Sequence, residues 1–219
     1  DLSSLGLGEE PKLGRTPNDE EILRLAEAAE DAQVRNALTA LMQTPAGLEA
    51  LLDVLDLHDA ALQWLERYTG IPYPWGKFDF LLVPSFQFGG MEHAGSIFYN
   101  ASALLLDPSA TQNQHLGRAS LIAHETAHMW FGDLVTMRWF NDVWMKEVFA
   151  NFMAAKIVNP SFPRVNHELR FLTAHYPGAY AVDRTQGTHA IRQELDNLNE
   201  AGSLYGNIIY LKAPIVMRQ

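Results

Sequence analysis

Apolar residues recur at helical spacing through the first third of the chain. A stretch rich in glycine and proline, residues 1–17, precedes this pattern and is typical of a linker or loop. The spacing then predicts one helix over residues 18–44 and a second over about residues 46–68, with an expected break near His58. Residues 18–69 are therefore predicted to form a helical segment that packs on the rest of the protein.

The middle of the chain has the pattern of short strands. A β-type run at residues 78–83 and shorter runs at 97–100 and 104–106 each predict a strand. Gly89 and Gly90 lie between the first two runs, where they indicate a tight turn or a close approach of the backbone. Together these features predict a small sheet.

Helical spacing returns in the second half of the chain. It predicts a helix over residues 111–131, ended by Gly132, and another over about 142–158, ended by an Asn-Pro pair. Weaker patterns predict two more helices, at 162–176 and 203–217. No internal repeat, low-complexity tract or second domain boundary interrupts this order.

Composition and charge exclude several classes of protein. The 219 residues carry 16 basic and 26 acidic side chains, a net charge of −10, which argues against sequence-independent binding of nucleic acid. The lack of cysteine excludes disulfides and thiol catalysis, so any metal must be held by His, Asp or Glu. No apolar run approaches the roughly 18 residues that cross a bilayer, and no targeting segment indicates a localisation. Because the chain begins at Asp1, we expect a processed product or part of a longer chain.

One short motif carries most of the chemical information. It reads His124-Glu125-Thr126-Ala127-His128, and Glu147 follows after eighteen further residues. Two histidines four positions apart lie on one face of a helix, so both imidazoles can reach a single cation. Glu125 lies at the flank of that face, where it can contact water at the metal without being a ligand. Composition alone predicts about 0.02 such matches in a chain of this length, so coincidence explains the motif poorly.

Glu147 can join the two histidines only if the chain reverses, and Gly132 provides a stop before the next predicted helix. Two neutral imidazoles and one carboxylate leave a zinc ion with a net positive charge and an open fourth position, as in catalytic sites. Such a site suits metal-assisted hydrolysis of an acyl bond, with Glu125 taking and returning the proton. The alternative is that the two histidines are ordinary helix residues. A structural or surface role is expected for five others, His58, His115, His167, His175 and His189.

Four motifs in the same order resemble the M1 family of zinc aminopeptidases, within the gluzincin clan. The zinc signature is the most specific of them. It continues into two further segments that are similar to those of the family, Trp130–Thr136 after the second histidine and Trp144–Ala150 around Glu147. Upstream, Gly89–His93 resembles the exopeptidase motif Gly-x-Met-Glu-Asn, and downstream Tyr210–Ala213 resembles Tyr-x-Lys-Gly. The resemblance covers the chain from about residue 65 to its end.

The resemblance implies a thermolysin-like α+β catalytic domain over residues 70–219, mostly helical, with a small mixed sheet whose edge strand leads into Gly89. It implies one zinc ion per chain, held by His124, His128 and Glu147. Glu125 is implied as the catalytic base and acid.

The resemblance also implies how a substrate binds. Glu92 is similar to the glutamate that receives the free α-ammonium of a peptide, with Gly89, Gly90 and Met91 beside it. Tyr210 is similar to the tyrosine that donates to the oxyanion of the tetrahedral intermediate. The implied partners are peptides with a free N-terminus and the flanking domains of a longer chain, since the family's other domains do not fit in 219 residues.

Four residues depart from the family pattern. His93 replaces an Asn beside the expected amine anchor, and Lys146 and Val148 replace the Asn and Gly that flank the third ligand. Lys146 is expected to shift the charge near the metal. Ala213 replaces the Gly after the last motif. These departures leave three hypotheses: an aminopeptidase, a gluzincin hydrolase that ignores the free amine (an endopeptidase or an epoxide-opening relative), and a non-catalytic zinc-binding domain.

Overall fold

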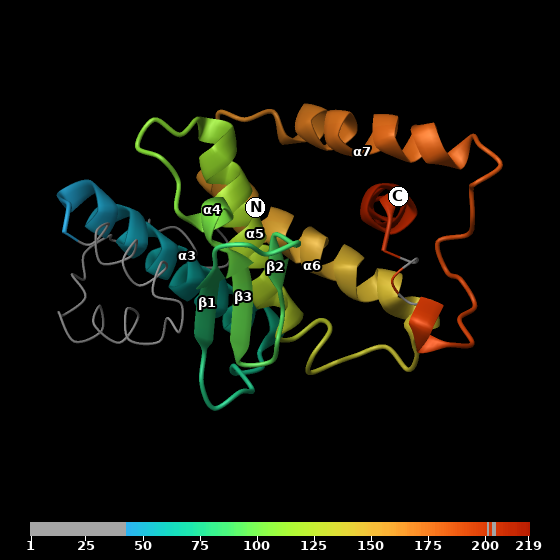
Figure 1. Cartoon of the computed structure of the whole chain (residues 1–219), viewed down its shortest axis with the longest axis horizontal. Helices are drawn as coiled ribbons and strands as arrows, with labels where there is room; N and C mark the ends of the chain where they lie inside the picture. The colour runs from blue at the N-terminus through green and yellow to red at the C-terminus, as the bar shows by residue number, and fades with distance from the viewer. Residues whose placement is uncertain (1–42, 201, 203–204) are drawn as a thin grey trace.

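The computed structural model describes residues 43–200, 202 and 205–219 (Figure 1). The linker predicted at 1–17 lies outside the described residues, and so does the helix predicted at 18–44 apart from its last two positions. Helices dominate the described part, and a small mixed sheet lies beside them. The predicted combination of many helices with a small mixed sheet is therefore confirmed.

The first described helix, α3, spans Pro45–Thr69 without interruption. The Thr44 side chain caps its start by accepting a hydrogen bond from the Gly47 amide, and Gly70 ends it at a φ of 68°, which favours glycine. The predicted break near His58 is wrong. His58 Nδ1 contacts the carbonyl of Val54 at 2.7 Å, one turn earlier, so the histidine fits a continuous helix.

Three strands form the sheet in the order β1-β3-β2. β1 (Asp79–Val83) runs parallel to β3 (Ser96–Asn100), and β2 (Gly90–Met91) pairs antiparallel with the other edge of β3. The two-residue strand β2 is thus itself the edge strand, whereas the sequence predicted an edge strand that leads into it. Alternate residues of β3 are buried, as expected for a strand that covers a core on one face.

The prediction of a strand at 104–106 is wrong. The chain instead forms a short helix, α4 (Ala101–Leu104), because the Asn100 side chain accepts a hydrogen bond from the Ser102 amide and caps the turn. Leu104 is fully buried at its end, which accounts for the apolar run that resembled a strand.

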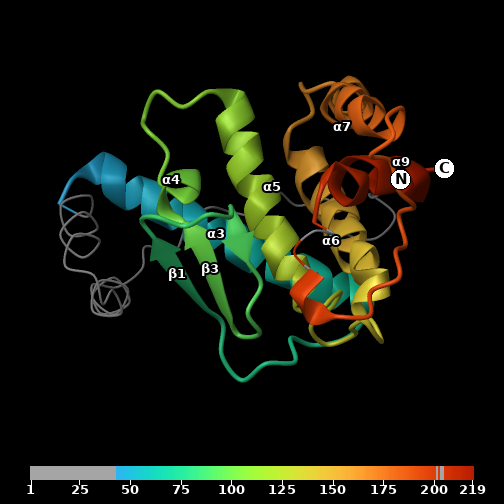
Figure 2. The ribbon, with the colours of Figure 1, turned by 45° about the vertical axis from the view of Figure 1, so that its right-hand side comes forward.

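Two long helices follow, α5 (Gln112–His128) and α6 (Val143–Val158). A capping box between Thr111 and Gln114 fixes the start of α5. α5 ends three residues before the predicted position, since the chain turns directly after His128. α5 packs against both α3 and α6, and Figure 2 shows the strands on one side of α5 and α6 on the other.

The C-terminal part covers α6. It consists of α7 (His167–Asp183), a π-helical turn at Ile208–Lys212 and α9 (Ala213–Met217). Short 3-10 turns at Phe140–Asp142, Asn159–Ser161 and Leu198–Glu200 join these helices to their neighbours. The helix predicted at 162–176 lies later in the chain than expected. Of the helix predicted at 203–217, residues 203–204 lie outside the described residues, and the rest contains the π-helical turn and α9.

The largest apolar core lies where α3, the sheet, α5 and α6 meet. Its most deeply buried large side chains include Leu65, Ile97, Tyr99, Leu104, Ile122, Met129 and Trp130. Members of this core come from the last turns of α5 and from the middle of α6. Among the described residues, no helix combines the length and apolar character needed to cross a bilayer.

Candidate functional site

The last two turns of α5 present the two motif histidines to one point. The Nε2 atoms of His124 and His128 lie 3.1 Å apart. His128 Nδ1 contacts the carbonyl oxygen of Phe131 at 3.1 Å. Because a carbonyl can only accept, Nδ1 carries the proton and Nε2 presents its lone pair toward His124. A histidine held in this tautomer has a free Nε2 lone pair that could bind a metal ion.

The turn after α5 explains how the Phe131 carbonyl reaches the ring. Gly132 has a φ of 149° and its amide donates to the Val135 carbonyl at 2.9 Å, which closes the turn. A Cβ at this position would lie 3.0 Å from His128 Nδ1. The chain passes this close to the imidazole because residue 132 is glycine.

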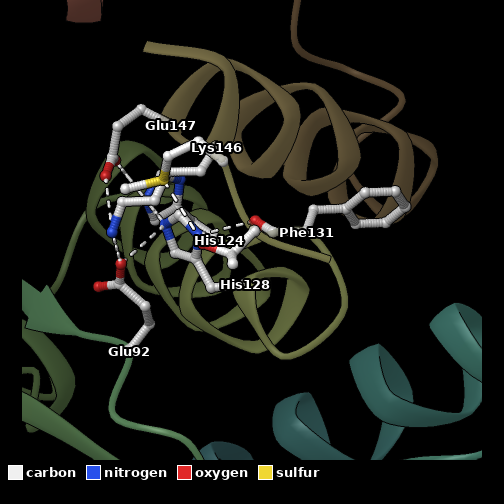
Figure 3. A network of polar contacts seen from close by, with 8 residues as sticks. Glu92, His124, His128, Phe131, Lys146 and Glu147 are labelled. Atoms are coloured by element: carbon white, nitrogen blue, oxygen red, sulfur yellow. Dashed lines mark hydrogen bonds and ion pairs between the residues drawn. The ribbon is translucent and has the colours of Figure 1, made fainter. Parts of the chain in front are cut away.

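Glu147 reaches the same point from the first turns of α6, so the chain reversal that the motif requires is present. Its Oε2 lies 3.5 Å from His124 Nε2 and 3.7 Å from His128 Nε2 (Figure 3). A tetrahedral zinc ion that binds N and O at about 2.0–2.1 Å separates its ligands by about 3.3–3.4 Å. The three atoms lie on a circle of about 2.0 Å radius, so they fit such an ion without rearrangement.

Electrostatics favour a cation at this position. Burial would raise the pKa of Glu147, but the imidazoles of His124 and His128 beside it outweigh burial and hold that pKa well below its usual range. Glu147 is therefore a carboxylate, and the pair of imidazoles beside it contributes lone pairs. These three side chains form one of two groups of described residues whose donor atoms could hold a metal.

The fourth motif residue, Glu125, lies on the side of this group that faces the sheet. Burial raises its pKa to about 7, with the charge of Glu92 adding to the shift against the opposing effect of His124. A carboxyl with a pKa near neutrality can both take and return a proton. One carboxylate oxygen of Glu125, one of Glu92 and a ring nitrogen of His128 lie within 4.8 Å of one another.

Strand β2 brings the exopeptidase-like motif to the same place. Gly90 pairs with Tyr99 and Met91 with Phe98 across the sheet, and the Gly89 carbonyl accepts from the Asn100 amide at 2.9 Å. A Cβ on Gly90 would lie 2.6 Å from the Glu125 carboxyl carbon, so the edge strand passes directly over that side chain.

Glu92 follows this strand and is buried beside the candidate metal ligands. Its Oε1 lies 4.0 Å from His128 Nε2 and forms an ion pair with the Lys146 ammonium (Figure 3). Burial would raise the pKa of Glu92, but His128 and Lys146 outweigh it and lower the pKa. A buried carboxylate thus lies next to the position that a metal would occupy.

The π-helical turn carries Tyr210, which lies at the edge of the site. Burial and then the charge of Glu147 raise the pKa of Tyr210 well above its usual value, so the hydroxyl stays protonated and can donate. The centroids of the Tyr205 and Tyr210 rings lie 6.4 Å apart. Burial raises the pKa of Tyr205, and the nearby charges of Lys146 and Glu147 shift it in opposite directions. π-Helical turns occur frequently at functional sites.

The structure thus brings the sequence-predicted residues of all four motifs into one region. Two contacts were not predicted: the Phe131 carbonyl on His128, and the Lys146 ammonium on Glu92. The first is a backbone contact with no side-chain signal. The second was within reach of the sequence, because Lys146 stood out as a departure from the family pattern.

Comparisons with known proteins identify the family of the chain. The peptidase family M1 domain matches residues 54–219. Over 165 residues the chain is 39% identical to the puromycin-sensitive aminopeptidase of Caenorhabditis elegans, an alignment covering 75% of this chain and 17% of that protein. It is 35% identical to the leucyl aminopeptidase of Saccharolobus solfataricus over 72% of this chain and 20% of that protein.

The human endoplasmic reticulum aminopeptidase 2 is 33% identical over 80% of this chain and 18% of its own length. The chain therefore spans about a fifth of the length of these curated relatives. The family domain covers most of the chain, including the helix pair and the edge strand that build the site. By this match, the chain belongs to peptidase family M1.

Proposed function

We propose that the protein is a zinc-dependent aminopeptidase that removes N-terminal residues from peptides. The observation that carries the proposal is the convergence of His124 Nε2, His128 Nε2 and Glu147 Oε2 at tetrahedral ligand spacing. The names of the relatives, which are aminopeptidases, support the reaction class. We further propose that residues 70–219 form a thermolysin-like catalytic domain on which α3 packs.

In this proposal the three converging atoms hold one zinc ion per chain. When bound, the ion supplies a Lewis acid that polarises an amide carbonyl and makes water more acidic. Glu125 takes a proton from the attacking water and returns it to the leaving amine, a role that its pKa of about 7 suits. Tyr210 donates a hydrogen bond to the oxygen on which negative charge develops.

Glu92 is proposed to select the substrate's N-terminus. A buried carboxylate beside the ion can bind an α-ammonium by a charge-assisted hydrogen bond, which fixes the scissile bond one residue from the end. Gly89, Gly90 and Met91 are proposed to line this part of the site, because β2 holds their backbone against α5.

A hydrolase that ignores the free amine is the second candidate function. It shares the zinc site, and the Lys146 ion pair on Glu92 favours it, because that carboxylate already has a cationic partner. Hydrolysis rates of matched peptides with free and acetylated N-termini separate the two. We expect the free peptide to be cleaved at least about tenfold faster. Equal rates would favour the second candidate.

The Glu125→Gln substitution tests the proposed mechanism. It preserves shape and removes the proton acceptor, so kcat should fall by about 10²- to 10⁴-fold while the zinc content stays at one per chain. The assay is hydrolysis of a leucyl reporter, paired with elemental analysis of the same sample. Undiminished turnover by the zinc-loaded variant would end the proposal. Zinc bound at full stoichiometry with no cleavage by the wild type would favour a non-catalytic zinc-binding domain.

A further inference from the structure

Lys146 lies beside the carboxylate that is proposed to receive the substrate. Its Nζ forms an ion pair with Glu92 Oε1 and lies 3.6 Å from Glu147 Oε1, and Figure 3 shows the ammonium between the two carboxylates. The side chains are largely enclosed, with Lys146 14% exposed and Glu92 8%. The contact is therefore not a solvated surface pair.

No other lysine or arginine in the described part of the chain pairs with Glu92, Glu125 or Glu147. The other groups that act on the Lys146 ammonium are Glu147 and the Tyr205 hydroxyl. Lys146 thus supplies the ammonium that this acidic site would otherwise lack. A buried carboxylate without a partner is costly, and the Lys146 ammonium supplies that partner for Glu92.

The lysine side chain ends in a primary ammonium, as a peptide's free N-terminus does. Both are compact cations with three donors, and both seek the same carboxylate oxygen. Two like charges so close together repel each other strongly in a poorly solvated site. A substrate ammonium can therefore bind Glu92 fully only when the flexible Lys146 side chain moves away.

We propose that Lys146 is a specificity-determining residue that occupies the ammonium position on Glu92 until a peptide's N-terminus displaces it. This inference rests on the proposed aminopeptidase function. Lys146 then competes with the substrate's free N-terminus for the Glu92 carboxylate, and it competes with no other part of the substrate. The lysine then lowers affinity for cationic N-termini and leaves affinity for neutral, acylated ones unchanged.

The test measures binding of L-leucinamide and N-acetyl-L-leucinamide by calorimetry to the zinc-loaded chain. All proteins carry Glu125→Gln, so that the amide is not cleaved, and the pH is 6.5, below the α-amine pKa of about 7.7–8.0. Lys146→Met removes the charge at similar length, and Lys146→Arg keeps the charge as the matched control. Equal zinc content and a thermal melt establish that each variant is folded.

We expect Lys146→Met to bind L-leucinamide about tenfold more tightly than the parent protein does, which corresponds to about 1.4 kcal/mol. Its affinity for the acetylated compound should stay within about twofold of the parent's. Lys146→Arg should bind both compounds as the parent does. Unchanged or weaker binding of L-leucinamide by Lys146→Met would overturn the inference. If that variant does not fold, Lys146→Gln carries the same expectation.

Turnover of a leucyl reporter by the wild type is measured separately. Its absence would refute the proposed function, whereas unchanged L-leucinamide affinity in Lys146→Met with normal wild-type turnover would refute only the role of Lys146. The two failures are therefore distinguishable.

Discussion

Two buried histidine environments in this protein contrast with each other. His58 lies in the apolar core with both ring nitrogens in contact with protein oxygens, Nδ1 with the Val54 carbonyl and Nε2 with the Tyr99 hydroxyl at 3.1 Å. Its ring stacks on Phe80 at a centroid distance of 4.4 Å. Every polar atom of this histidine is accounted for by the fold.

His128 is buried and His124 is largely buried, but unlike His58 they do not have hydrogen-bonding oxygens at both ring nitrogens. Their Nε2 atoms point at each other and at Glu147, and His124 Nδ1 has no hydrogen-bond partner among the described residues. Burial alone therefore does not separate a structural histidine from a functional one. The separation lies in whether the ring nitrogens are used by the fold or converge on one point with a carboxylate.

The largest expected effect comes from His128→Ala, compared with His58→Gln. Removing a converging nitrogen should abolish stoichiometric zinc binding and lower kcat/KM by roughly 10³- to 10⁴-fold, since the ion's contribution to catalysis is several kcal/mol. His58→Gln should keep one zinc per chain. Elemental analysis and reporter turnover on both variants check the contrast. Full zinc content in His128→Ala would mean that the two environments do not differ as described.

Tyr210→Phe should have the next largest effect. Loss of a hydroxyl that donates to the developing oxyanion should lower kcat by about 10²- to 10³-fold with little change in KM or zinc content. Tyr205→Phe is the matched control, because it removes a hydroxyl from the neighbouring ring. Steady-state kinetics on both variants decide the assignment. A larger loss in Tyr205→Phe would transfer the role to that residue.

His58 should make the free energy of unfolding depend on pH. Burial lowers the pKa of His58 to about 4 in the folded protein, against about 6.5 when unfolded. Below pH 6.5 the unfolded chain binds a proton that the folded chain does not, so stability is lost as the pH falls from 6.5 through 4. This loss should reach about 3 kcal/mol.

Denaturant unfolding of the wild type and of His58→Gln at pH 7 and pH 4 measures this effect. The wild type should lose about 3 kcal/mol more than the variant between the two values. His115→Gln, a replacement on the partly exposed side of α5, is the matched control. The same pH slope in the wild type and in His58→Gln would show that His58 is not held neutral by the core.

Much of the site was predictable because its information is local. The i, i+4 spacing of the histidines needs only helical geometry, and Glu125 between them needs no tertiary contact. The position of Glu147 depended on a chain reversal that Gly132 made expected. The proximity of Glu92 and Tyr210 followed from the resemblance to a family, because no periodicity relates residues so far apart in the chain.

The errors in the fold have identifiable physical causes. The run at 104–106 resembled a strand because its leucines are apolar, but the Asn100 cap starts a helical turn and Leu104 fills the core. The break expected near His58 is absent because the Val54 carbonyl and the Tyr99 hydroxyl supply partners for the ring within a continuous helix. The Tyr99 hydroxyl lies far from His58 in the chain, so this contact becomes visible only in three dimensions.

The central claim is that three side chains from α5 and α6 share one zinc ion. A crystal structure of the zinc-loaded protein, with anomalous data collected on both sides of the zinc absorption edge, tests it most directly. The account predicts one strong peak about 2.0–2.2 Å from His124 Nε2, His128 Nε2 and Glu147 Oε2. Zinc bound elsewhere, or a peak that Glu147 does not contact, would contradict it.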